Sequence, residues 1–212
     1  MLTSNINYIM SGYRRGVFPM AESKSSEEIF WIKPEERGII PIGKLHISRS
    51  LKKLIKAKTF HSTVNKCFAE VVKRCADRKN TWINSKLFDL YIELHKGGHA
   101  ISVEIWQNKD LIGGLFGITV GSCFCGESMF STATNGSKLA LIVTMARLKY
   151  NKYRLFDTQF PTSHLQSMGG KTISQATYEN LLSHLIYDER TLLSLPKNYS
   201  WPELLQLNNH IL

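Results

Sequence analysis

The amino-acid sequence predicts a mixed fold of the α+β or α/β class, with a small N-terminal domain followed by a larger domain. The chain has 212 residues, of which 43% are hydrophobic, so it can bury a sizeable core. Hydrophobic residues alternate along residues 100 to 130, as is typical of β-strands. The segments on both sides have helical spacing, and strands mixed with helices in this order are typical of the class.

The first 36 residues are expected to form the small domain. They begin with a short helix, which ends before Gly16 and Pro19 because both residue types interrupt helices. A polar loop at residues 23 to 28 and extended pieces follow. We therefore place a boundary near residue 36, which separates residues 1–36 from residues 37–212.

Residues 48 to 58 have the spacing of an amphipathic helix whose apolar stripe is Leu51, Leu54 and Ile55. The basic face of this helix consists of Arg49, Lys53 and Lys56. Eight Lys or Arg residues and no acid occur between residues 37 and 66, in a chain of net charge +10. A solvated face usually mixes both signs, so we interpret this one as a phosphate-binding surface. An ordinary solvated helix face is the alternative.

The remaining elements follow in order along the chain. Helices are expected at residues 64–76 and 86–96, the second ending at Gly97 and Gly98. The meander consists of strands at residues 99–107, 111–121 and 123–130. After it come a strongly apolar helix at 137–149, a strand at 154–160 and a helix at 174–186. Asn135 or Ser137 is the expected N-cap of the apolar helix.

Three polar residues stand out beside apolar strands. Glu127 follows a glycine at the end of the third strand, and Asp157 and Gln159 share one side of a later strand. If Phe156 and Phe160 pack in the core, the carboxylate and the amide project together from the opposite surface. A semi-buried acid needs partners, which favours a functional interpretation. An aspartate that caps a loop or pairs with an arginine is the alternative, and the pattern alone favours it.

Several common site types are missing from the sequence. It has no phosphate-binding loop of the G-x-x-x-x-G-K-[ST] type, no H-E-x-x-H motif and no G-x-S-x-G motif, and no cluster has metal-ligand spacing. The four cysteines, Cys67, Cys75, Cys123 and Cys125, form no C-x-x-C pair. No secretion signal and no membrane-spanning run is visible, so we expect a cytoplasmic protein with reduced thiols. His46 and His164 are interpreted as structural hydrogen-bonding residues.

A series of motifs resembles one family over nearly the whole chain, the leucyl/phenylalanyl-tRNA–protein transferases. The motifs are GYRRGVFP (12–19), LHISRSLKK (45–53), TWI (81–83), ISVEIW (101–106), GGLFGITVG (113–121), GESMFS (126–131), NGSK (135–138), DTQ (157–159) and HLQSMGG (164–170). The pairing of GESMFS with a later D-x-Q is specific, and the conserved order makes coincidence improbable.

The resemblance implies a fold and an activity. The second domain would be of the GCN5-related acetyltransferase type, and the N-terminal domain would be shorter than is usual in the family. The enzyme would move Leu or Phe, with Met as a further candidate, from charged tRNA to proteins whose N-terminal residue is Arg or Lys. This reaction marks such proteins for N-degron proteolysis and needs no cofactor and no metal.

The resemblance also implies site residues. Asp157, Gln159 and Glu127 match the family's catalytic residues. The pocket for the transferred side chain would include Leu115, Phe124, Leu148 and Thr144. Trp82, Tyr91 and Met20 match positions near the aminoacyl-adenosine, and Arg49, Lys53 and Lys56 match the tRNA-binding cluster. Met20 stands where a tryptophan is common, and Thr144 replaces an aromatic residue, so stacking on the adenosine and the depth of the pocket are the properties most open to change.

Two other functions remain as alternatives. An acyl-CoA-dependent N-acyltransferase can share the same fold, but such enzymes cradle pyrophosphate with a loop of the form [RQ]-x-x-G-x-[GA]. Residues 131–137 contain one glycine and lack that pattern. A non-catalytic tRNA-binding protein is the third possibility, and the complete set of Glu127, Asp157 and Gln159 argues against it.

Overall fold

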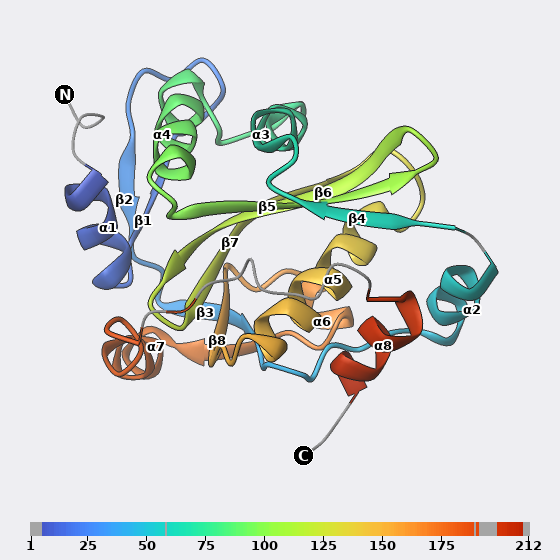
Figure 1. Ribbon diagram of the computed structural model, residues 1–212. Helices are drawn as coiled ribbons and strands as arrows, with labels where there is room; N and C mark the ends of the chain where they lie inside the picture. The colour runs from blue at the N-terminus through green and yellow to red at the C-terminus, as the bar shows by residue number, and fades with distance from the viewer. Residues whose placement is uncertain (1–5, 58, 189, 191–198, 210–212) are drawn as a thin grey trace.

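The computed structural model describes residues 6–57, 59–188, 190 and 199–209. Its helices are α1 (Ile6–Arg14), α2 (Arg49–Ala57), α3 (Phe68–Ala76), α4 (Ser85–Lys96), α5 (Gly136–Tyr150), α6 (Ser163–Ser167), α7 (Gln175–Ser183) and α8 (Trp201–Asn209). Its strands are β1 (Phe18–Met20), β2 (Phe30–Ile32), β3 (Glu36–Ile40), β4 (His61–Val64), β5 (Ala100–Gln107), β6 (Asp110–Val120), β7 (Cys123–Ser131), β8 (Leu155–Gln159) and β9 (Lys171–Ser174). The mixed class expected from the sequence is therefore confirmed (Figure 1).

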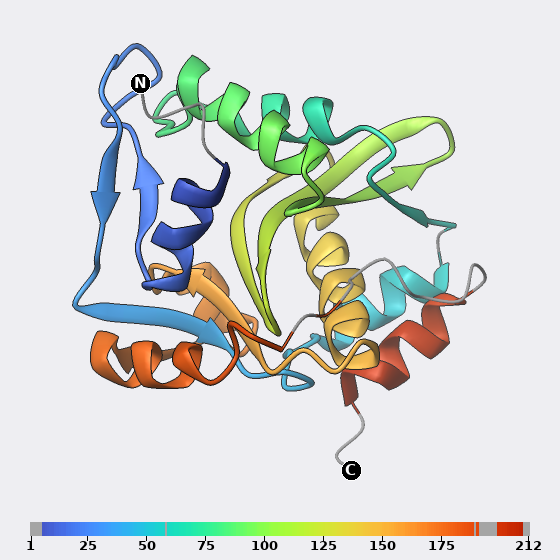
Figure 2. The same ribbon diagram turned by 60° about the vertical axis from the view of Figure 1, so that its left-hand side comes forward.

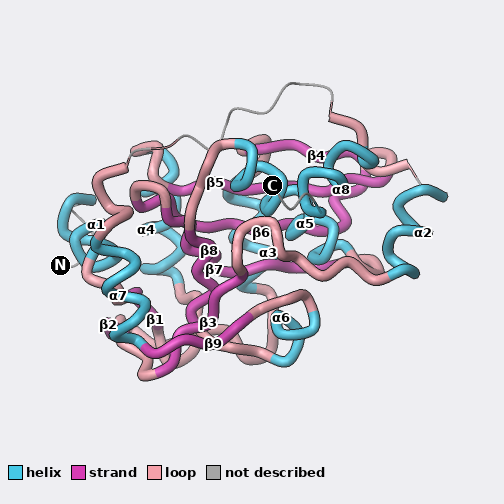
Figure 3. Tube along the Cα trace, turned by 90° about the horizontal axis from the view of Figure 1, so that it is seen from below, coloured by secondary structure: helices cyan, strands magenta, loops and turns pink. Residues whose placement is uncertain are grey.

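A seven-stranded sheet organises the chain, with strand order β4-β5-β6-β7-β8-β3-β9. The strands β5, β6 and β7 form the antiparallel meander that the alternating pattern predicts. Further along, β3 lies between β8 and β9 and pairs with both, as the view from below shows (Figure 3). Residues near the predicted domain boundary thus enter the large sheet as one of its strands.

Helices cover both faces of the sheet, so the core has two parts (Figure 2). One part joins α1, α3, α4 and α7 to one face, through residues such as Tyr13, Leu87 and Tyr178. The other joins α2, α5 and α8 to the opposite face. The helix α5 has a long apolar middle because it lies between the sheet and α8, and ten of its fifteen residues are buried.

The strands β7 and β8 run parallel, and α5 connects them. They pair only over three positions, Cys123 with Leu155, Phe124 with Phe156, and Cys125 with Asp157. Beyond those pairs the two strands no longer pair, although β7 continues to Ser131. Glu127 and Gln159, two of the predicted site residues, lie at this opening in the sheet.

The structure corrects the sequence analysis at the start of one helix. The helix expected at residues 64–76 begins only at Phe68, because the preceding residues form the strand β4 against β5. Thr63 and Val64 are β-branched and suit that strand. The short elements α6, β9 and α8 were not expected, since each is too brief or too weakly patterned to be recognised.

The N-cap of α5 is Asn135, one of the two expected residues, but the capping hydrogen bond comes from elsewhere. Asn135 occupies the cap position with φ of 71°, but its side chain makes no capping bond, and Ser137 lies inside the helix. Instead, the hydroxyl of Ser131 accepts a hydrogen bond from the backbone N–H of Ser137 at 2.9 Å. The capping hydrogen bond therefore comes from Ser131 at the end of β7. This bond holds the start of α5 next to the opening.

No helix in the described part of the chain is long and apolar enough to cross a membrane.

Candidate active site

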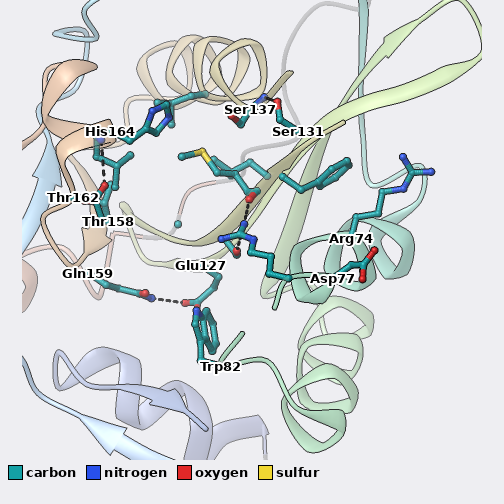
Figure 4. A pocket seen from close by; sticks show the side chains of 18 of the residues that line it. Arg74, Asp77, Trp82, Glu127, Ser131, Ser137, Thr158, Gln159, Thr162 and His164 are labelled. Carbon is teal, nitrogen blue, oxygen red and sulfur yellow. Dashed lines mark hydrogen bonds between the residues drawn. The ribbon is translucent and has the colours of Figure 1, made fainter. Parts of the chain in front are cut away.

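A pocket of about 1060 Å³ opens where β7 and β8 separate. Its walls come from residues 126–131 of β7, from the end of β8, from α3 and from the first turn of α5 (Figure 4). Apolar side chains such as Leu115 and Phe156 form part of the lining, and charged side chains of α3 form its rim. An apolar cavity with a few converging polar groups is the usual form of a small-molecule site.

Glu127 lies in this pocket and is 7% exposed. One carboxylate oxygen, Oε1, accepts hydrogen bonds from the hydroxyl of Tyr13 at 3.0 Å and from Nε2 of Gln159 at 2.9 Å. The other, Oε2, accepts one from the hydroxyl of Tyr91 at 2.9 Å. Tyr13 comes from α1 and Tyr91 from α4, so the first helix of the chain completes the surroundings of this carboxylate.

Burial dominates the electrostatics of Glu127. Loss of hydration raises the pKa of its carboxyl group to about 7, although the three hydrogen bonds favour the ionised form, and the charge of Asp157 adds to the rise. Burial first, and the charge of Glu127 second, raise the pKa of Tyr13 and of Tyr91. The two tyrosines thus remain donors, and Glu127 titrates near neutral pH.

Asp157 is fully buried and makes a bidentate ion pair with Arg37 of β3. Nε of Arg37 donates to Oδ1 at 2.8 Å and Nη2 donates to Oδ2 at 2.6 Å. The hydroxyl of Tyr178 donates to Oδ2 at 2.9 Å, and the ring of Tyr178 lies 4.1 Å from the guanidinium carbon. Burial opposes the charge of Arg37, but the charge and hydrogen bonds of Asp157 outweigh it and raise the pKa of Arg37.

Gln159 connects the two carboxylates. Its side chain donates to Glu127, and its backbone N–H donates to Oδ1 of Asp157 at 2.8 Å. The backbone of Gln159 has φ of 63°, a conformation that few residues other than glycine adopt without support. Because Asp157 bonds the backbone rather than the side-chain amide, it fixes where Gln159 lies.

The neighbouring strand allows this unusual backbone. Gly38 of β3 lies opposite Gln159, at a bulge in the pairing of β3 with β8. A methyl group on Gly38 would lie 2.8 Å from the hydroxyl of Thr158 and 2.9 Å from the backbone of Phe160. Only glycine permits that close approach, so Gly38 and Asp157 together hold the end of β8 in place.

The expectation that Asp157 and Gln159 project from the surface is wrong. Both faces of β8 are covered, and the exposed fractions of Asp157 and Gln159 are 0% and 5%. Phe156 packs in the core as expected, but Phe160 is 41% exposed because the backbone turns at Gln159. Asp157 does pair with an arginine, as the alternative interpretation held.

The other predicted residues fall into two groups. Leu115 and Trp82 line the pocket. Tyr91 bonds Glu127, and Trp82 meets the ring of Tyr91 edge-on at 6.3 Å. A second set lies outside the lining. Phe124, Leu148 and Thr144 are fully buried in the core around α5, where the hydroxyl of Thr144 donates to the carbonyl of Ala140, and Met20 lies half-buried in β1.

The predicted basic helix forms as α2, with Leu51 and Ile55 buried and Leu54 half-buried. Arg49, Lys53 and Lys56 are exposed, as a phosphate-binding face requires. They do not line the pocket, whose basic rim is instead formed by Lys24, Lys73, Arg74 and Arg78. His164 lines the pocket and burial lowers its pKa.

Sequence reasoning missed three residues that shape the site. Tyr13, Arg37 and Tyr178 come from α1, β3 and α7, and each is at most 1% exposed. Their pairing with Glu127 or Asp157 spans 114, 120 and 21 residues, which no local pattern reveals. The one available signal was Arg37 itself, a cation next to the apolar residues of β3.

The cysteines are reduced in the structure, as the sequence analysis expects. All four cysteines are free thiols. Within the described residues, no group of three or more His, Cys, Asp or Glu side chains is placed to hold a metal ion.

Comparison with known proteins identifies the family. Residues 39–183 match the family model described as leucyl/phenylalanyl-tRNA protein transferase, and residues 5–35 match the N-terminal domain of the same family. A protein of Ruegeria sp. named leucyl/phenylalanyl-tRNA–protein transferase is 45% identical over 185 residues, covering 87% of this chain and 88% of that protein. One of the same name from Maricaulis maris is 43% identical over 202 residues, covering 93% and 94%.

A solved structure titled "Crystal structure of FemX" is similar to this chain in fold only, with a TM-score of 0.50 and 12% sequence identity. The match covers 76% of this chain and 66% of that one. The family model and the sequence relatives, rather than this structure, identify the family. This chain belongs to the leucyl/phenylalanyl-tRNA protein transferase family and is an aminoacyltransferase.

Proposed function

We propose that this chain transfers leucine or phenylalanine, with methionine as a further donor, from charged tRNA to the α-amine of proteins that begin with Arg or Lys. The transfer would act in the cytoplasm and mark the acceptor for degradation. The observation that carries the proposal is Glu127, a carboxylate that titrates near pH 7 in the pocket, where Tyr13, Tyr91 and Gln159 orient it.

The fold supports an acyl transfer of the GCN5-related type. The parallel strands β7 and β8 separate after Cys125 and Asp157, and the helix α5 connects them. This arrangement leaves an opening in the middle of the sheet that can receive both substrates. The likeness to the FemX structure agrees with that fold.

The chemistry follows from the charge state of the acceptor. An α-ammonium has an ordinary pKa near 8 and cannot attack while it is protonated. The carboxylate of Glu127 accepts one proton from the ammonium and frees the amine. The amine nitrogen then bonds the ester carbonyl carbon, the carbon–oxygen bond to the terminal ribose breaks, and the second proton passes to the departing ribose oxygen.

Gln159 and Asp157 have separate parts in this proposal. Gln159 donates to Glu127 through Nε2, so its carbonyl oxygen Oε1 serves as the acceptor for the incoming amine. Asp157 does not line the pocket and acts as a positioning residue, because it bonds the backbone N–H of Gln159. Together they hold the reacting groups close, an effect that can contribute several kcal/mol.

Apolar contacts explain the donor. Leu115, Phe156 and Leu141 line the pocket and offer no charge to an amino-acid side chain. Phe124, Leu148 and Thr144 pack behind this wall as a second layer of the same core. Trp82, at the pocket, and Tyr91 provide aromatic surface for the terminal adenosine, with Met20 near by in the N-terminal region. The exposed Arg49, Lys53 and Lys56 bind phosphates of the tRNA.

Transfer of label tests the proposal. The protein is incubated with radiolabelled leucyl-tRNA and a test protein that begins with Arg, and label in the protein fraction is counted. The matched acceptor is the same protein with an acetylated N-terminus, which has no free α-amine. Label in the first acceptor and none in the second supports the proposal, whereas equal label in both, or none in either, contradicts it.

A further inference from the structure

A second groove of about 480 Å³ lies beside the pocket. Glu70, Arg74 and Thr132 line both hollows, so the two are adjacent. Its volume lies within the range of about 300–1,000 Å³ that is usual for ligand sites. Nothing in the proposed transfer of the amino acid itself uses it.

An aromatic side chain dominates this groove. Trp106, near the end of β5, lines it and is half-buried. The indole Nε1 donates to the hydroxyl of Thr63 at 2.8 Å, which fixes the ring in place. The exposed ring of His61 stacks on the indole, with the ring planes at 8° and the ring centres 6.0 Å apart. Such surfaces bind nucleobases by stacking.

The charges of the groove suit a nucleotide. Nζ of Lys66 lies 5.0 Å from the centre of the Trp106 ring, and Lys109 is exposed at the wall. Glu70 adds little negative charge because it pairs with Arg74 at 2.6 Å. Asp110, on the same wall, is an acceptor of the type that can bond the exocyclic amine of a cytosine.

The groove lies next to the pocket, and the chain connects it to the C-terminal end of α2. The chain leaves α2 at Ala57 and enters β4 at His61, which is paired with Trp106 (Figure 1). Four residues can span at most about 14 Å, so the end of α2 is near the His61–Trp106 pair. An RNA strand that contacts the end of α2 and reaches the pocket therefore has the groove within reach.

We propose that this groove binds the unpaired cytidines that precede the terminal adenosine of the donor tRNA. This inference rests on the proposed function and adds a site to it. A base stacks on Trp106 in place of the Lys66 ammonium, and Lys66, once displaced, and Lys109 face the backbone phosphates between the cytidines. The terminal adenosine then enters the pocket with its amino acid directed toward Glu127.

Three donors of increasing length separate the contributions of each site: phenylalanyl-adenosine, a phenylalanylated CCA trinucleotide, and phenylalanyl-tRNA. The wild-type enzyme should have a lower KM for the trinucleotide than for the adenosine. Replacement of Trp106 by Leu should raise the KM for the trinucleotide and for the tRNA about five- to a hundred-fold, as loss of one stacked base implies. The KM for phenylalanyl-adenosine should not change.

Two controls keep the test specific. Trp106→Phe keeps an aromatic ring but loses the bond to Thr63, so it should retain most of the trinucleotide advantage. Lys109→Gln should weaken use of the trinucleotide, whereas Lys152→Gln, at an exposed turn after α5, should not.

The outcomes that would overturn the inference are distinct. If the wild-type enzyme uses the trinucleotide no better than the adenosine, the groove does not bind cytidines, although the proposed function stands. If Trp106→Leu impairs all three donors equally, Trp106 is structural and the inference is wrong. If no donor supports transfer, the proposed function fails and the groove inference fails with it.

Discussion

Replacing Glu127 by Gln should make the protein less sensitive to pH. In the folded chain burial raises the pKa of Glu127 from 4.5 to about 7, so between these values the folded state binds more protons than the unfolded state. The free energy of unfolding therefore falls as the pH rises through this window. Each pKa unit corresponds to about 1.4 kcal/mol, so the wild-type protein should lose about 3 kcal/mol by pH 8. The Gln variant has no carboxyl group at this position and should not incur this loss.

Urea unfolding at several pH values between 4 and 8 measures the effect. The stability of the Gln variant relative to the wild-type protein should rise by about 3 kcal/mol across the series. Any constant difference, such as a weakened hydrogen bond with Tyr13 or Tyr91, cancels when the change with pH is compared. If the relative stability does not depend on pH, burial does not raise the pKa of Glu127 toward 7. The proposal that Glu127 accepts a proton near neutral pH would then lose its support.

Three further results are expected. Asp157→Ala should lower the free energy of unfolding by about 3–5 kcal/mol, because it leaves the guanidinium of Arg37 buried without its carboxylate, and a denaturant midpoint equal to wild type would contradict this. Leucyl- and phenylalanyl-tRNA should be used and aspartyl- and lysyl-tRNA rejected in a label-transfer assay, since burying a charge against Leu115 and Phe156 is costly; equal use of aspartyl-tRNA would refute the apolar pocket. Neutralising Arg49, Lys53 and Lys56 together should weaken binding of every charged tRNA alike and reduce the salt dependence of binding, whereas an effect that varies with the amino acid would exclude a phosphate role.

The periodic elements could be predicted from the sequence because their signals are local. The alternation of residues 100 to 130 predicted the meander, and the spacing of residues 48 to 58 predicted α2 with its exposed basic face. The motif around Glu127 and the D-x-Q pair were predicted on strands, and the structure brings the side chains of Glu127 and Gln159 within 2.9 Å of each other.

The environment of those residues could not be predicted, because partners distant in the chain create it. The alternation of side chains along a strand predicted that Asp157 and Gln159 lie on the same face of β8. It could not show that α1 and α7 cover that face. The ion pair with Arg37 depends on β3 lying next to β8, a non-sequential pairing. Because Asp157 is part of the core, we expect its removal to lower the stability of the protein.

The most direct measurement is the mass of the acceptor after the reaction. A test protein that begins with Arg is incubated with phenylalanyl-tRNA and this enzyme, without ATP, and its N-terminal peptide is sequenced by mass spectrometry. We expect one phenylalanine joined to the former N-terminus, with Arg now second, and a much smaller yield with Glu127→Gln. An unmodified N-terminus, or phenylalanine attached elsewhere in the protein, would contradict transfer to the α-amine.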